Sequence, residues 1–222
     1  VEQGIDSYLG LAVIFAEPER SLPLLQDAFG TADSDLRLAY ARVLGLLGDD
    51  MGAAVLIDRL TGSGWDEGWN YRGMGQFGLS LSEVDTLLIA LARSGAEGAC
   101  GVLIEKVGQL QPQDALSHCR ALALSFKACP VPQAAAALAR LLQSEEVRGA
   151  ACCDLREMLK DLPGNTTDNV QRNRELKELH LARALLACGD PDGLAVRVLR
   201  EYSVDLHGHY ARHARAILRG VE

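Results

Sequence analysis

Apolar residues recur at steps of three and four along much of the chain, which is the spacing of one face of an α-helix. Residues 36–47 show this spacing most clearly, and residues 52–60 repeat it after a turn at Gly48. We expect Asp33 or Ser34 to cap the first of these helices and Gly48 to end it, because glycine adopts left-handed backbone without steric cost. The expected buried face of the first helix consists of Leu36, Ala39, Tyr40, Val43, Leu44 and Leu47.

The same arrangement, two apolar helices joined by a short turn, recurs along the chain. Further copies cover residues 84–110, 118–142 and 179–202, and a fainter copy covers residues 9–29. Repetition at this scale is typical of stacked helical hairpins. The sequence therefore predicts an all-α fold, a right-handed α-solenoid of about five hairpins in a single domain over residues 1–222.

Two insertions interrupt the repeat, near residues 62–80 and 160–175. The first contains both tryptophans of the chain and six of its 22 glycines, and it enters the next helix through Ser80 and Glu83, which match a capping box. The second is polar and rich in turn-forming residues, and we expect it to be a surface excursion. Loops on a rigid scaffold frequently carry binding residues, so the first insertion is the main candidate for function.

Residues 62–78, called the aromatic loop below, combine aromatic, acidic and cationic side chains. Trp, Tyr and Arg dominate the energetics of protein interfaces, because they bury large areas at modest entropic cost. The loop is therefore expected to bind a protein partner. Two alternatives remain: the loop is compact and its aromatic side chains only cover the surface of the scaffold, or it forms a small-molecule site. The expected partner-binding residues are Trp65, Asp66, Trp69, Asn70, Tyr71, Arg72, Gln76 and Phe77.

Gly73, Gly75 and Gly78 match the glycine spacing of a dinucleotide-binding fingerprint. That motif functions at the end of a β-strand inside a βαβ unit. The sequence shows no such strand, so we assign no cofactor to the loop.

A second candidate site lies near the C-terminal end of the chain. Two of its histidines are four residues apart and share a helix face, as in many zinc sites. The neighbouring arginines would repel a bound cation, however, and the two histidines lack between them the glutamate that zinc proteases have. The alternative is a helix start whose histidines cap or hydrogen-bond adjacent turns. The residues are His207, His209, Tyr210, Arg212 and His213; we assign no metal site, and no nucleophile constellation indicates a catalytic residue.

The net charge of −8 disfavours nucleic-acid binding, which requires a basic face. Residues 1–110 carry 16 acidic against 7 basic residues, so the negative charge lies almost entirely in this half. No apolar run approaches the roughly 20 residues that span a bilayer, and we expect no membrane association.

The six cysteines lack the paired spacing of zinc ligands. They are expected to be buried free thiols, which favours the cytoplasm, although the sequence contains no targeting segment that fixes the localisation. The residues are Cys100, Cys119, Cys129, Cys152, Cys153 and Cys188.

The helix–turn–helix units resemble HEAT-type repeats, including the short bacterial form found in phycobilisome-lyase-like proteins. Residues 64–78, 84–91 and 205–214 are similar to the helical C-terminal region of bacterial FAD-dependent oxidoreductases. This resemblance implies that the chain is a piece of a longer protein, with a flavin domain preceding Val1. No flavin-binding residue matches here, so the chain itself is expected to hold no cofactor, with FAD in the missing N-terminal domain.

The sequence thus predicts a non-catalytic scaffold or interaction module that binds another protein or a sister domain of its own polypeptide. Its terminal repeats are expected to favour self-association. The alternative is a ligand-binding or enzymatic protein. In it the aromatic loop and the histidine stretch form one cleft, which requires the helical superhelix to curve strongly. A HEAT-like DNA glycosylase is a third hypothesis, suggested by Trp65 and Asp66 and disfavoured by the acidic charge.

Overall fold

The computed structural model describes residues 16–72, 81–160 and 169–220. Within these ranges the chain consists of helices and connecting segments without strands, which confirms the all-α prediction. The helices are α2 (Pro18–Thr31), α3 (Ser34–Leu47), α4 (Ala53–Thr61), α5 (Glu83–Ser94), α6 (Ala99–Gln109), α7 (Leu116–Ala128), the short 3₁₀ helix η1 (Pro132–Ala134), α8 (Ala135–Leu142), α9 (Leu155–Lys160), α10 (Val170–Ala187), α11 (Leu194–Tyr202) and α12 (Gly208–Leu218).

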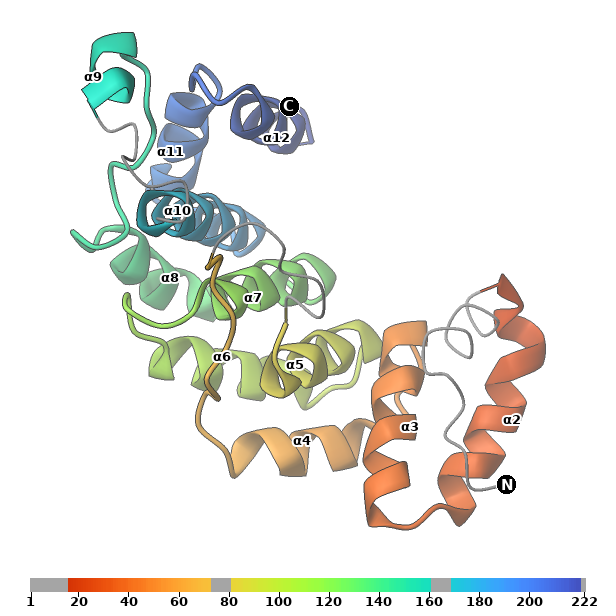
Figure 1. The fold of residues 1–222 in the computed structure, drawn as a ribbon. Helices are drawn as coiled ribbons and strands as arrows, with labels where there is room; N and C mark the ends of the chain where they lie inside the picture. The colour runs from red at the N-terminus through yellow and green to blue at the C-terminus, as the bar shows by residue number, and fades with distance from the viewer. Residues whose placement is uncertain (1–15, 73–80, 161–168, 221–222) are drawn as a thin grey trace.

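The helices form two rows that follow an arc (Figure 1). Helices α3, α5, α7 and α10 pack side by side in that order, and α4, α6 and α8 form the second row. At the ends, α2 packs against α3, while α11 and α12 continue from α10. Within the hairpin copies predicted from the sequence, turns near residues 48, 95, 129 and 189 each separate two helices. Most of the fainter copy's first helix lies outside the described residues.

Helix boundaries follow the local capping signals. The Asp33 side chain accepts a hydrogen bond from the Leu36 amide, and Gly48 ends α3 in left-handed conformation with φ 89°. Both predictions are confirmed. The capping box of α5 is shifted by two residues, because Ser82 pairs with Asp85. Ser80 lies outside the described residues.

The expected buried face of α3 was partly wrong. Leu36 is 53% exposed, whereas Ala41, Leu44 and Gly45 are buried. Helix α3 contacts α2, α4 and α5, so its contact surface is not the single stripe that a two-helix unit would produce. A side chain at Gly45 would place its Cβ 2.6 Å from the carbonyl oxygen of Ala90, so glycine permits the close approach of α3 and α5.

The second insertion is shorter than predicted. Helix α10 begins at Val170, within the range 160–175 that was expected to be irregular. Its first turns are polar in sequence, but Glu175 and Glu178 are buried by neighbouring segments. A polar stretch therefore became helix because tertiary contacts supply partners that the local sequence does not reveal.

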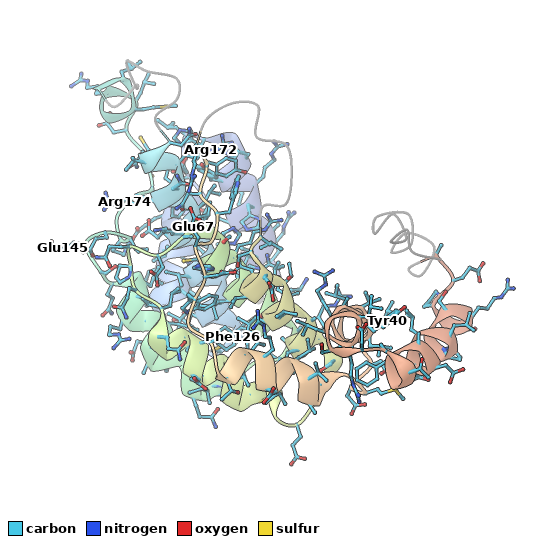
Figure 2. All side chains as sticks on the ribbon, turned by 60° about the horizontal axis from the view of Figure 1, so that its bottom comes forward. Tyr40, Glu67, Phe126, Glu145, Arg172 and Arg174 are labelled. Atoms are coloured by element: carbon cyan, nitrogen blue, oxygen red, sulfur yellow. The ribbon has the colours of Figure 1, made fainter. Side chains whose placement is uncertain are left out.

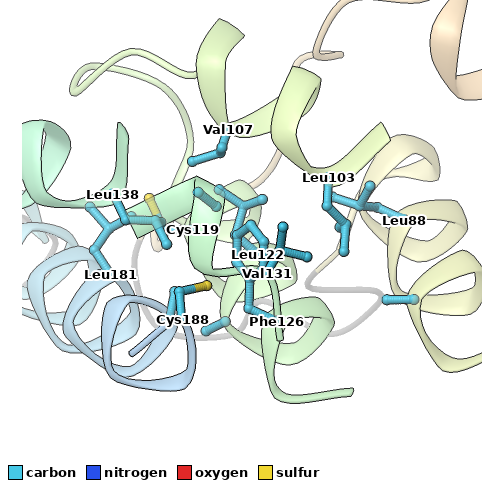
Figure 3. Packing of buried hydrophobic residues seen from close by; sticks show 14 of the residues in the cluster. Leu88, Leu103, Val107, Cys119, Leu122, Phe126, Val131, Leu138, Leu181 and Cys188 are labelled. Atoms are coloured by element: carbon cyan, nitrogen blue, oxygen red, sulfur yellow. The ribbon is translucent and has the colours of Figure 1, made fainter. Parts of the chain in front are cut away.

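One continuous apolar core joins the two rows (Figure 3). Leu88, Leu103, Leu122 and Phe126 are each fully buried within it. The side chains are mainly leucine and alanine, which allow helices to pack closely. None of the helices in the described part of the chain has the length and apolar character that a membrane crossing requires.

We predict that Gly45→Ala destabilises the fold by about 1–3 kcal/mol, because the added methyl group meets the backbone of Ala90. Urea denaturation monitored by circular dichroism measures the change. Gly101→Ala is the matched control: Gly101 is a helical glycine with open space around its Cβ position, and alanine there should stabilise by about 0.5–1 kcal/mol. Equal stability of the two variants would contradict the close α3–α5 approach.

Candidate functional site

The described part of the aromatic loop, residues 62–72, leaves α4 and runs past α6 and α7 toward α10 (Figure 1). Its hydrogen bonds reach α6, then α7, and finally α10. The loop therefore links three helices whose bonded residues lie 41, 48 and 102 residues from it in the sequence. Most of its aromatic and amide groups are directed toward the chain's own helices.

The start of the loop is fixed by Trp65. The indole Nε1 donates to the Lys106 carbonyl at 3.1 Å, and the Lys106 ammonium donates to the Ser63 carbonyl. Lys106 is completely buried, and burial lowers its pKa. Its ammonium lies 5.9 Å from the centre of the Trp65 ring. The buried cation is therefore held by a loop carbonyl and by an aromatic face.

An ion pair lies directly beneath Trp65. The His118 ring is 4.4 Å from the Trp65 ring, its Nδ1 is 2.7 Å from Asp85 Oδ1, and its Nε2 is 3.1 Å from the Asp66 carbonyl. A carbonyl only accepts hydrogen bonds, so Nε2 carries a proton; with Asp85 ionised, Nδ1 carries one as well.

The electrostatics agree with a charged pair. Burial opposes the charged form of His118, but the hydrogen bond and negative charge of Asp85 outweigh it and raise the pKa of His118. Burial also opposes ionisation of Asp85, and the contacts with His118 and Ser117 outweigh it and lower the pKa of that carboxyl.

Gly68 makes the close contact between loop and pair possible. Its φ is 66°, in the left-handed region. A Cβ there would lie 2.4 Å from Ala115 Cβ and 2.6 Å from His118 Nε2. Glycine is therefore required both by the backbone conformation and by the space available.

The middle of the loop caps α7. The first amides of a helix have no partner within the helix, and the residue preceding α7, Ala115, provides no side-chain acceptor. The Asn70 side chain accepts from the Leu116 amide at 2.8 Å, and the Trp69 carbonyl accepts from the Ser117 amide at 3.0 Å. A segment remote in sequence thus satisfies the start of this helix.

The far end of the loop meets α10. The Asn173 side chain accepts from the Tyr71 amide at 2.9 Å and donates to its carbonyl at 3.0 Å. The Arg172 guanidinium, labelled in Figure 2, lies 3.9 Å from the centre of the Tyr71 ring. Arg72 is exposed and pairs with Glu67.

These contacts locate most of the predicted loop site. Trp65, Asp66, Trp69, Asn70 and Tyr71 contact neighbouring helices or each other, and Asp66 also accepts from the Val84 amide. Gln76 and Phe77, and the glycine fingerprint at 73–78, lie outside the described residues. Binding of a partner by the loop remains a prediction.

The histidine stretch forms the beginning of α12. His207 occupies the N-cap position, and its Nδ1 lies 2.9 Å from Asp205 Oδ1. The other carboxylate oxygen of Asp205 accepts from the Cys152 amide at 2.7 Å. His207 therefore takes part in fixing a turn, as the structural alternative predicted.

The remaining histidines of the stretch diverge. The His209 ring lies 4.0 Å from the Tyr210 ring, whereas the His213 ring faces that of His180, 6.5 Å away between ring centres. Arg212 donates back to the Gly208 carbonyl. In the ranges that the structure describes, no three His, Cys, Asp or Glu side chains are grouped as metal ligands.

Arg172 connects the loop with the histidine stretch. Arg172 contacts Tyr71. The pKa of His209 is lowered first by burial, then by the charge of His207, and then by that of Arg172. The charge of Arg172 also acts to lower the pKa of Tyr210, although burial raises it overall. Behind them lies Glu175, only 3% exposed. Burial raises the pKa of Glu175, although His207 and Tyr210 counteract it.

Sequence reasoning missed the groups that hold these segments. Lys106, Arg172 and Asn173 belong to regular helices, and nothing local distinguishes them. Glu178 is a further case: its carboxylate accepts from the Gly149 and Ala150 amides, the Tyr202 hydroxyl and Arg148. The sequence did indicate a capping box before α5, but it was predicted from Ser80 and Glu83, two residues before the Ser82 and Asp85 that form it.

No family model matches the chain, and no match was found among the curated proteins or the solved structures.

The expectation that all six cysteines are buried was partly wrong. Cys100 and Cys153 are exposed, and Cys152 and Cys153 lie outside any helix, because the segment before α9 has no regular structure. The sulfurs of Cys100 and Cys129 are 3.5 Å apart. His180 lies in the middle of α10, and its buried Nδ1 has no hydrogen-bond partner.

We predict that His118→Asn lowers the free energy of unfolding by about 3–5 kcal/mol at mildly acidic pH, because it leaves a buried carboxylate unpaired. The pKa of His118 is raised above 6.5, so the stabilisation is complete below that pH and is lost as the pH rises through the raised pKa. The pKa of Asp85 is lowered below 3.8, so its contribution is present above that pH and is lost on further acidification.

Urea denaturation of both proteins at several pH values tests this. The difference in unfolding free energy should be largest between pH 3.8 and 6.5 and should shrink toward alkaline pH. His209→Asn, at an exposed histidine, is the control and should change stability little. A difference that stays constant through neutral and alkaline pH would show that His118 is neutral in the folded protein.

Proposed function

We propose that this chain is a non-catalytic helical-repeat module, a right-handed HEAT-like solenoid, that binds a protein partner. The expected partner is an FAD-dependent oxidoreductase domain of the same polypeptide. The ordered rows of helices support the repeat architecture, and the stretches similar to the helical region of such oxidoreductases support the choice of partner.

One observation carries this proposal: two histidines suited to chemistry, His118 and His207, are engaged with carboxylates or carbonyls of the chain itself. His118 is bonded to Asp85 and Asp66, and His207 to Asp205. These contacts hold segments of the chain together, so the imidazoles of His118 and His207 serve the fold.

The same bracing produces a preorganised exposed surface. Glu67 and Arg72 form an ion pair on the outside of the loop, with side chains 86% and 66% exposed. Between them in the sequence, the backbone amides of Trp69 and Tyr71 are held by hydrogen bonds to α7 and α10. A rigid surface loses little conformational entropy when a partner binds, which favours docking at this face.

Self-association through the terminal repeats stays a prediction. Leu24 on α2 is 71% exposed, which is the kind of apolar surface that a terminal repeat presents. Concentration-dependent sedimentation distinguishes a monomer from a dimer.

Determination of the complete reading frame tests the choice of partner, and we expect a flavin domain N-terminal to Val1. With that domain prepared separately, the double reversal Glu67→Arg, Arg72→Glu should weaken its calorimetric affinity for this chain at least about tenfold, the equivalent of 1.4 kcal/mol. Arg59 and Glu83 form another exposed ion pair, and the corresponding reversal there is the matched control.

Retained helical content in both variants establishes that folding is intact. Equal affinities would exclude the loop as the docking surface. A reading frame without a flavin domain would exclude the proposed partner, although the loop would still be testable against another protein.

A second candidate function is ligand binding or catalysis at the junction of loop and α12. The observation that favours it is Arg172, which contacts Tyr71 and whose charge also reaches His209. A cation beside a phenol and an imidazole suits a polar ligand. The raised pKa of Glu175 provides a carboxyl group that retains its proton more readily than usual, as a general acid requires.

Elemental analysis of purified protein tests the metal-dependent version of this alternative, and we expect no stoichiometric metal. Thermal-shift screening against small acids, phosphates and sugars tests the remainder. A ligand of this site should raise the melting temperature, and Arg172→Gln should abolish the shift. Arg156→Gln, at an exposed arginine of α9, is the control; a shift that survives Arg172→Gln would exclude the junction.

A further inference from the structure

A pocket of about 530 Å³ lies between α7, α10 and the end of α12, away from the aromatic loop. Its charged and titratable lining groups are Lys127, Arg183 and His213. The rest of the wall is made of Leu186, Ala187, Ala216, Ile217 and Gly220. The pocket thus combines a cationic group of side chains with an apolar surface.

The positive charge in this pocket is not balanced by acidic groups. In the described parts of the chain, none of Lys127, Arg183 and His213 forms an ion pair, and no Asp or Glu lines the pocket. The chain as a whole carries a net charge of −8. A concentration of cations in an acidic protein therefore calls for a specific explanation.

The pKa values of groups in and beside the pocket reflect its unbalanced positive charge. Burial lowers the pKa of Arg183, and burial followed by the charge of Arg183 lowers the pKa of His213. His180, next to His213, has a pKa lowered to about 3 by burial and then by His213, Arg120 and Arg183. The charges that lower the pKa values of His180 and His213 are all positive, so they favour the neutral forms of both imidazoles. An anion bound in the pocket would favour the charged form of His213 instead.

A larger groove at the other end of the molecule provides the comparison. It has a volume of about 850 Å³ and contains Arg37, Arg42 and Arg59. Asp58 and Glu83 line the same groove, and Glu83 pairs with Arg59. Acidic side chains therefore share that groove with the arginines and pair with one of them, whereas no acidic side chain lines the pocket near His213.

We propose that the pocket formed by Lys127, Arg183 and His213 binds a small organic phosphate, with the phosphate on the cations and its apolar part on Leu186 and Ile217. Phosphate carries up to two negative charges and accepts several hydrogen bonds, so it matches a guanidinium with further cations better than a single carboxylate does. The volume is within the range of small-molecule sites, about 300–1,000 Å³.

Isothermal titration calorimetry with phenyl phosphate tests the proposal, because this probe has both a phosphate and an apolar ring. We expect saturable binding at one site, tighter than that of inorganic phosphate. Arg183→Gln should weaken it at least about tenfold, since a charge-assisted pair is lost, and Lys127→Gln and His213→Gln should weaken it less. Arg200→Gln, at an exposed arginine on α11, should leave it unchanged.

Circular dichroism and melting temperature of each variant verify folding. Should Arg183→Gln fail to fold, His213→Gln and Lys127→Gln carry the test. Absence of saturable binding, or affinities unaffected by all three pocket substitutions, would overturn the proposal.

The probes also separate sources of phosphate. Equal binding of phenyl phosphate and inorganic phosphate would contradict the apolar subsite and indicate an adventitious ion only. Binding to phosphatidylcholine vesicles that contain phosphatidic acid, without binding of phenyl phosphate, would assign the surface to lipid headgroups and overturn the small-molecule site. Neither result depends on the partner proposed for the aromatic loop.

Discussion

The ion pair between Asp85 and His118 determines where the aromatic loop lies. Both side chains are buried, and a buried charge is tolerated only when it is paired and its remaining hydrogen-bonding groups are satisfied. The Asp66 carbonyl satisfies the second nitrogen of His118, and the Trp65 ring covers the imidazole. The pair thus links α5 with α7 and requires the loop to pass directly over it.

The loop in turn completes the helices beneath it. Helix α7 lacks a side-chain cap of its own, and Asn70 and Trp69 supply acceptors for its first amides. Asn173 extends the contact to α10 through both the amide and the carbonyl of Tyr71. The aromatic loop, whose composition makes it a candidate binding loop, therefore also stabilises the packing of the helices. The two roles are compatible, because bracing the backbone leaves Glu67 and Arg72 exposed.

Charge is distributed differently at the two ends of the molecule. Near α3–α5, arginines face acidic side chains, and near Glu178 a buried carboxylate receives amide, hydroxyl and guanidinium donors. Between α7, α10 and α12 the cations remain without acidic counterparts in the described residues. Uncompensated charge at a concave surface is a frequent property of ligand sites, whereas compensated charge serves mainly to fix the fold.

The sequence by itself determined the helices, their turns and several of their ends, because periodicity and capping act over a few residues. Asp33 and Gly48 illustrate this, since each acts within one helical turn. The exposure of Leu36, the early start of α10 and the unpaired nitrogen of His180 depended on neighbours remote in sequence. The site followed the same rule, because composition identified the aromatic loop and the histidine stretch. Only the tertiary structure brought Lys106 and Asn173 to the loop, because helix packing sets these contacts over separations of 41 and 102 residues.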